Sequence, residues 1–161
     1  MSRPLLFLDV DGPLNPYAAQ PQHRPPGYTT LRVPLGPGRS PLAGRTLRVW
    51  LNPAHGPELL ALDYDLCWAT TWMADANRWI APALGLPDLP YVDFGAALLR
   101  ERPDGVHWKT AALVDHAAGR AFAWVDDEHT ELDDRYVAAH HPGPALLHFV
   151  SPRLGLLPPD F

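Results

Sequence analysis

The residues with the clearest chemical potential are two aspartates in the stretch FLDVDGPLN, residues 7–15. Asp9 and Asp11 follow a short apolar run and are separated by a single residue. Side chains two positions apart on an extended backbone point to the same side, so both carboxylates can serve one site. Gly12 then allows the chain to turn sharply. Such a pair can divide nucleophilic attack and proton transfer between two acids.

Five further polar residues stand where apolar runs end or where a helix is expected to begin. Thr70 and Thr71 follow one apolar run, and Asp126 and Asp127 end another. Lys109 is the single lysine among 13 basic residues and precedes an apolar helical segment. Ligands of parallel sheets bind beyond the carboxyl ends of the strands, so we expect these side chains to gather there.

The gathered residues suit phosphoryl chemistry assisted by a metal. If Asp9, Asp126 and Asp127 lie close together, repulsion between their negative charges would raise the pKa of some of these carboxyl groups unless a cation is present. Mg²⁺ prefers oxygen ligands, whereas the sequence has no Cys/His cluster for zinc. Lys109 would supply fixed positive charge, and Thr70 a hydroxyl and a backbone N–H for phosphoryl oxygens.

Alternating strands and helices must position these residues. Near-continuous apolar runs predict buried strands over 4–10, 64–70 and 121–128. A shorter strand is predicted over 89–94 and a last strand over 145–150. Helical patterns predict helices over 52–63, 71–85, 107–119 and 130–140. This alternation favours a single α/β domain over residues 1–161, a three-layer, Rossmann-like, doubly wound parallel sheet.

A β-hairpin is expected between the first two buried strands. Residues 28–33 and 45–51 are β-rich, and a Gly/Pro/Ser-rich stretch over 34–44 separates them. The hairpin, about residues 28–51, would form a small flap, and no segment is long enough for a large cap domain. Its arginines are either ordinary solvated charge or a contact for a phosphorylated polymer: Arg32, Arg39, Arg45 and Arg48.

Composition narrows the class of protein. The chain has 161 residues, 47% hydrophobic and 19% charged, which is typical of a globular domain. A net charge of −5 argues against a large nucleic-acid-binding face. The one cysteine, Cys67, excludes an internal disulfide and is expected to be a buried packing residue. No signal peptide or membrane span is evident, so we expect a cytoplasmic protein with no membrane partner and no obligate protein partner.

The ordered motifs resemble those of the haloacid dehalogenase (HAD) superfamily. Asp9-x-Asp11-Gly12, Thr70, Lys109 and Asp126-Asp127 follow one another as the four motifs of that family do. The stretches FLDVDGPLNP, WATTW, WVDDE and SPRLGL are similar to the HAD domain of Swiss Army Knife RNA-repair proteins, which also occurs as stand-alone actinobacterial proteins. The resemblance extends from residue 4 to about 157, and Pro13 stands where the family usually has Thr or Val.

The resemblance implies a role for each matching residue. Asp9 would be the nucleophile and a metal ligand, and Asp11 the general acid/base with its backbone carbonyl on the metal. The second acid is what family phosphatases keep and family dehalogenases lack. The remaining implied roles are phosphate binding by Gly12, Thr70 (or Thr71) and Lys109, and Mg²⁺ binding by Asp126, with or without Asp127.

The expected function is therefore that of a Mg²⁺-dependent hydrolase, a phosphatase with an aspartyl-phosphate intermediate and an open, capless site. Its substrate would be a phosphorylated small molecule or macromolecule. Two alternatives stay open: a phosphatase that processes RNA or DNA ends in repair, and a catalytically silent phosphate-binding module. Trp50 or Trp72 near the site either packs in the core and flap or stacks on a base.

Overall fold

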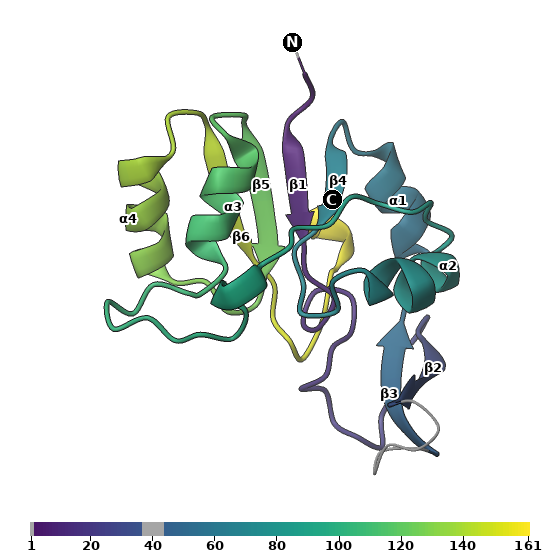
Figure 1. Ribbon diagram of the computed structural model, residues 1–161. Helices are drawn as coiled ribbons and strands as arrows, with labels where there is room; N and C mark the ends of the chain where they lie inside the picture. Colours follow the sequence, from purple (N-terminus) through teal and green to yellow (C-terminus); the bar gives the residue numbers. More distant parts are fainter. Residues whose placement is uncertain (1, 37–43) are drawn as a thin grey trace.

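The computed structural model describes residues 2–36 and 44–161, which form an α/β structure (Figure 1). A four-stranded parallel sheet has the order β4-β1-β5-β6, and a separate two-stranded antiparallel sheet pairs β2 with β3. The strands are β1 Leu5–Leu8, β2 Thr29–Leu35, β3 Arg45–Leu51, β4 Asp65–Trp68, β5 Phe122–Asp126 and β6 Ala145–Phe149. The helices are α1 His55–Ala61, α2 Ala81–Leu84, α3 Thr110–Ala117 and α4 Glu131–His140, with short helical turns η1 Ala76–Ile80, η2 Gly95–Ala97 and η3 Pro158–Asp160.

Apolar cores cover both faces of the parallel sheet. Leu6 and Leu8 of β1 belong to one core, which contains residues of the hairpin, α1 and α2. Leu5 and Phe7 belong to the other, which contains residues of α3 and α4. Figure 1 shows α3 and α4 on the left of the sheet and α1 and α2 on the right. β1, β4 and β5 are buried on both faces, which explains why their sequence runs are apolar rather than alternating. β6, at the edge of the sheet, is instead largely exposed, with Leu146 and Phe149 open to solvent.

The strand order reverses at β1. The chain runs from β1 to β4 on one side and later places β5 and β6 on the other. The carboxyl ends of β1 and β5 therefore lie side by side at the reversal, where open α/β sheets bind ligands. Asp9 N–H donates to the Val125 carbonyl at 3.1 Å, which extends the pairing of the two strands as far as the acidic residues.

The predicted hairpin is present. Val33 pairs with Leu47 and Leu31 with Val49, so one face of β2 and β3 is apolar and packs on the core. Residues 37–43 of the predicted tip, with Arg39, lie outside the described residues.

Proline changes two of the predicted elements. Residues 89–94 form only an isolated bridge between Trp68 and Tyr91 instead of a strand. Pro90 has no N–H and contributes only its carbonyl, to Trp68 N–H at 2.8 Å. The helix predicted over 71–85 becomes regular only from Ala76, as the π-helical turn η1 followed by α2. Pro82 cannot donate to a carbonyl four residues earlier, which accounts for the wider turn before it.

The C-terminal segment packs on the loop that follows β1. Leu156 N–H donates to the Pro13 carbonyl at 2.8 Å, and Ala18 N–H donates to the Pro152 carbonyl at 3.0 Å. Pro13, unusual for the resembled motif, therefore holds the chain's last segment through its carbonyl. Along the described ranges 2–36 and 44–161, no helix combines the length and apolar character needed to cross a membrane.

Substitution of Gly56 tests the close contact between α1 and α2. A Cβ atom at Gly56 would lie 1.7 Å from the Leu84 carbonyl oxygen, so the backbones would have to separate. We expect Gly56→Ala to lower the free energy of unfolding by about 2–3 kcal/mol, measured by urea denaturation. Glu58→Ala, on the exposed side of the same helix, should change it by less than about 0.5 kcal/mol. Equal urea midpoints for the two variants would contradict the close packing of Gly56 on the Leu84 carbonyl.

Candidate functional site

A cavity of about 430 Å³ opens beyond the carboxyl ends of β1 and β5. Its walls come from the loop after β1, the hairpin strand β3, the turn after β4 and the segment before α3. The lining residues are Asp9, Asp11, Asn15, Tyr17, Leu47, Arg48, Thr71, Leu99, Trp108, Lys109 and Glu128. Four of the candidate site residues from the sequence thus line one cavity: Asp9, Asp11, Thr71 and Lys109.

Lys109 lies between two buried carboxylates. Its Nζ is 2.7 Å from Asp126 Oδ2 and 3.3 Å from Asp9 Oδ2. Burial alone would lower the pKa of Lys109, but the attraction of Asp9 and Asp126 outweighs it and raises the pKa above its ordinary value. The lysine therefore stays charged although its side chain is almost fully enclosed.

Asp126 is fully engaged by hydrogen-bond donors. Its Oδ1 accepts from the backbone N–H groups of Asp127 (2.8 Å) and Glu128 (3.2 Å). Its Oδ2 accepts from Trp124 Nε1 at 3.1 Å as well as from Lys109. Burial would raise the pKa of Asp126, yet the charge and hydrogen bond of Lys109 hold that pKa below its ordinary value. Four donors occupy the lone-pair sites that a carboxylate offers.

The two other acids beside it carry raised pKa values. Burial raises the pKa of Asp9 well above its ordinary value, beyond what Lys109 offsets, and the charges of Asp126 and Asp11 add to the effect. Burial also raises the pKa of Asp127 to about 6, although the Tyr17 hydroxyl, which donates to Asp127 Oδ2 at 2.6 Å, opposes the shift. Both acids would ionise more readily beside a cation.

The donor set fits a metal ion. Asp9, Asp126 and Asp127 each offer a carboxylate oxygen, and these atoms lie within 4.8 Å of one another. An all-oxygen set suits a hard divalent cation. Asp126 would have to share its oxygens with the four donors that it already accepts from, whereas Asp9 and Asp127 have fewer donors.

Asp11 is oriented by two side chains that sequence reasoning did not assign to it. Asn15 Nδ2 donates to Asp11 Oδ1 at 2.9 Å, and Trp72 Nε1 donates to Asp11 Oδ2 at 3.0 Å. Asn15 Oδ1 in turn accepts from the Trp50 backbone N–H at 3.1 Å. The proximity of Asn15 to Asp11 in sequence was the only signal; the tryptophan contacts arise from tertiary structure.

The two threonines have different positions. Thr71 lines the cavity, whereas the buried Thr70 accepts from Trp72 N–H through its Oγ1 at 3.1 Å. The geometry thus places Thr71, the alternative to Thr70, on the cavity wall. Gly12 has φ +106°, and a Cβ there would lie 2.6 Å from the Asp127 carboxyl. The glycine therefore makes room for Asp127.

Asp133 supports the segment that carries Lys109. Its Oδ1 accepts from His107 N–H at 2.8 Å and from Thr110 Oγ1 at 2.6 Å. Its Oδ2 accepts from Thr130 N–H at 2.8 Å, which completes a capping box at the start of α4. The sequence pattern Thr-x-x-Asp signals only the cap; the link across to α3 could not be inferred from it.

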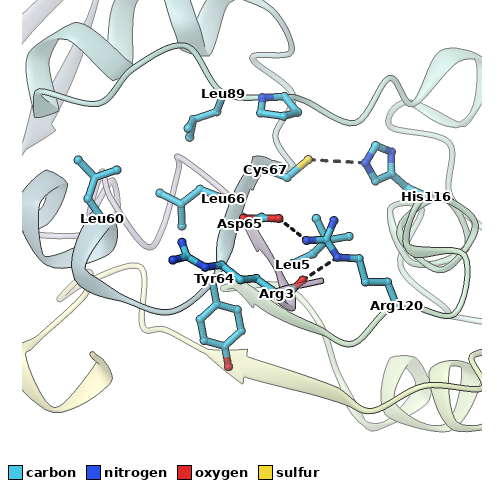
Figure 2. A pocket seen from close by; sticks show the side chains of 11 residues that line it. Arg3, Leu5, Leu60, Tyr64, Asp65, Leu66, Cys67, Leu89, His116 and Arg120 are labelled. Carbon is cyan, nitrogen blue, oxygen red and sulfur yellow. Dashed lines mark hydrogen bonds and ion pairs between the residues drawn. The ribbon is translucent and has the colours of Figure 1, made fainter. Parts of the chain in front are cut away.

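A second cavity, of about 450 Å³, lies at the opposite ends of β1 and β4 (Figure 2). Asp65 pairs there with Arg120, whose Nε also donates to the Arg3 carbonyl at 2.7 Å. Cys67 Sγ is 3.9 Å from His116 Nε2, and burial raises the pKa of the Cys67 thiol to about 11. A protonated thiol and a satisfied ion pair offer little chemistry, so the acidic cavity is the better candidate.

Comparison with known proteins gives no relatives. No protein-family model matches the chain, and neither the curated proteins nor the solved structures contain a match. The functional argument therefore depends on the residues and their geometry.

The raised carboxyl pKa values predict coupled proton and metal binding. Between the ordinary Asp pKa and about 6, folded wild-type protein holds a proton on Asp127 that the unfolded chain has released, so this contribution to stability is lost as pH rises. Without divalent cations, the melting temperature of wild type relative to Asp127→Asn should therefore fall between pH 5 and pH 7.5. Adding Mg²⁺ at pH 7.5 should reverse the difference. A difference in melting temperature that changes with neither pH nor Mg²⁺ would contradict the assignment of Asp127 to a metal site.

The Asp133 network predicts a large loss of stability from one buried carboxylate. Asp133→Ala leaves donors from His107, Thr110 and Thr130 without their acceptor, and should lower the free energy of unfolding by about 3 kcal/mol. Asp134→Ala, exposed in the same turn of α4, serves as the control and should change it by less than about 0.5 kcal/mol. Urea denaturation of both variants measures the contrast, and similar losses would refute the assigned role.

Proposed function

We propose that this chain is a Mg²⁺-dependent phosphatase of the HAD type that acts through an aspartyl-phosphate in an open site. The observation that supports it most is the pairing of Asp9 and Asp11 in one cavity, with Lys109 buried against Asp9. The reversal of strand order beside these acids and the cores on both sheet faces support a doubly wound, Rossmann-like assignment.

The two oxygens of Asp9 have different partners. Oδ1 accepts from Val10 N–H at 2.8 Å, and Oδ2 faces Lys109. In the proposed mechanism Oδ2 would attack phosphorus, forming an aspartyl-phosphate, a mixed anhydride, as the bond between phosphorus and the leaving oxygen breaks. Lys109 favours the ionised nucleophile and offsets negative charge in the transition state.

Asp11 would move the proton in both half-reactions. Protonated Asp11 donates to the leaving oxygen; the resulting carboxylate then takes a proton from a water molecule, which attacks phosphorus and releases phosphate and free Asp9. The donors Asn15 and Trp72 fix the Asp11 carboxyl toward the cavity.

Mg²⁺, when bound by Asp9 and Asp127 beside Asp126, would neutralise the acidic cluster and stabilise negative charge on the phosphoryl oxygens. In the described part of the chain, the hairpin and the segment between α2 and α3 border the cavity, and both are short, in keeping with a site that lacks a large cap. A silent binding module would not need a second oriented acid, so the complete set favours catalysis.

A nucleic-acid end remains the alternative substrate, but the structure adds no observation in its favour. Trp50 is buried and covered by the Arg48 guanidinium, so its ring face is not open for stacking on a base. Trp72 uses its indole N–H to orient Asp11.

Substituting the two acids separates their roles. Asp9→Asn removes the nucleophile with little change in shape, and should reduce Mg²⁺-dependent phosphate release from an aryl phosphate by at least about 1,000-fold. Asp11→Asn should reduce it by about 100-fold or more. Asp63→Asn, in an exposed ion pair away from the cavity, is the control and should keep full activity. Folding of each variant is checked by thermal unfolding; full activity in folded Asp9→Asn would overturn the mechanism.

A further inference from the structure

Arg48 brings a second cation to the cavity from the hairpin. The side chain is half-buried, and its guanidinium carbon lies 3.7 Å from the centroid of the Trp50 ring. Its Nη1 donates to the Pro21 carbonyl at 2.9 Å. Stacking and this hydrogen bond hold the guanidinium in one orientation, so little entropy would be lost when its other N–H groups bind an anion.

The positive charge of Arg48 is available to a ligand in a way that the charge of Lys109 is not. Lys109 is held by Asp9 and Asp126. Within residues 2–36 and 44–161, no carboxylate forms an ion pair with Arg48. A fixed guanidinium without an acidic partner at a cavity wall is suited to bind a carboxylate or a phosphate.

A series of contacts links Arg48 to Asp11, and both residues line the cavity. Arg48 stacks on Trp50, whose backbone N–H donates to Asn15 Oδ1. Asn15 Nδ2 donates to Asp11 Oδ1. Because Asp11 would protonate the leaving oxygen in the proposed function, the groups around Asp11 face the leaving group rather than the transferred phosphoryl group.

Apolar side chains complete the cavity wall. Leu47 precedes Arg48 on β3, and Leu99 and Trp108 line the same cavity. Leu99 is 66% exposed, so a large apolar side chain is available at the mouth for contact with a ligand. Among the described residues, the cavity thus offers an apolar surface and, in Arg48, a cation without an acidic partner.

We propose that Arg48 is a specificity-determining residue that selects phosphate esters whose leaving group carries a second negative charge on a largely apolar body. This inference rests on the proposed phosphatase activity. The second anion would be a carboxylate or another phosphate, both of which the planar guanidinium can bind with two N–H donors.

Arg32 provides a matched control. It pairs directly with Arg48 in the hairpin register, and both residues precede apolar positions of the same small sheet. Arg32 is exposed and does not line the cavity, so Arg32→Gln removes one positive charge from the hairpin without removing a cavity contact.

The test compares three phenyl phosphates that carry a carboxylate, a second phosphate or a neutral carboxamide at the para position. Wild type should show a higher kcat/KM for an anionic ester than for the carboxamide. Arg48→Gln should reduce that preference by about 10-fold to 100-fold, whereas Arg32→Gln should leave it unchanged. Dividing each variant's preference by that of wild type cancels differences in leaving-group reactivity and in the folded fraction. Comparing the carboxylate with the second phosphate identifies the favoured anion.

Arg48→Lys retains the charge without the planar stack and should keep part of the preference. An equal loss for all three esters in Arg48→Gln, or no preference for either anionic ester in wild type, would overturn the inference and leave the phosphatase activity intact. Wild type that hydrolyses none of the three esters with Mg²⁺ would instead overturn the proposed function and the inference with it.

Discussion

The buried contact between Lys109 and Asp126 is the constraint on which the rest of the site depends. Both side chains are almost completely enclosed, so each would be a costly isolated charge without the other. The pair in turn allows Asp9 to lie 3.3 Å from the same lysine. Removing Lys109 would leave two buried carboxylates without their cation, and removing Asp126 would leave Lys109 with Asp9 as its acidic partner, so stability and chemistry are coupled in these residues.

Much of the surrounding structure keeps that contact in place. Asp126 is held by backbone N–H groups and by Trp124, which comes from the same strand. Lys109 is carried by a segment whose start is fixed by Asp133 of α4. The reversal of strand order at β1 then brings Asp9 to the same edge of the sheet. Elements far apart in sequence thus converge on one ion pair.

The structural elements that depend on a local sequence pattern were predictable from the sequence. Apolar runs located the strands of the parallel sheet, β-rich segments located the hairpin, and the helix predicted to end at residue 85 ends at Gly85, which is in the left-handed conformation. The pattern favoured Thr70 over Thr71 because Thr70 comes first after the apolar run, but Thr71 lines the cavity. A shift of one residue at a strand end changes which side chain faces the cavity, and the pattern does not specify that shift. The partners of Asp11 could not be inferred either, since Trp72 meets Asp11 only through the packing of distant segments. HAD membership, the substrate and a cytoplasmic location stay predictions.

Gly12, whose part in phosphate binding stays a prediction, also has a structural role. Its missing side chain is the space that the Asp127 carboxyl occupies. In a saturation mutagenesis library selected for function, position 12 would tolerate few substitutions, and this intolerance would resemble that of a ligand-binding glycine. Its physical origin would be the backbone, which has φ +106°, and the volume beside Asp127, which a side chain would have to displace.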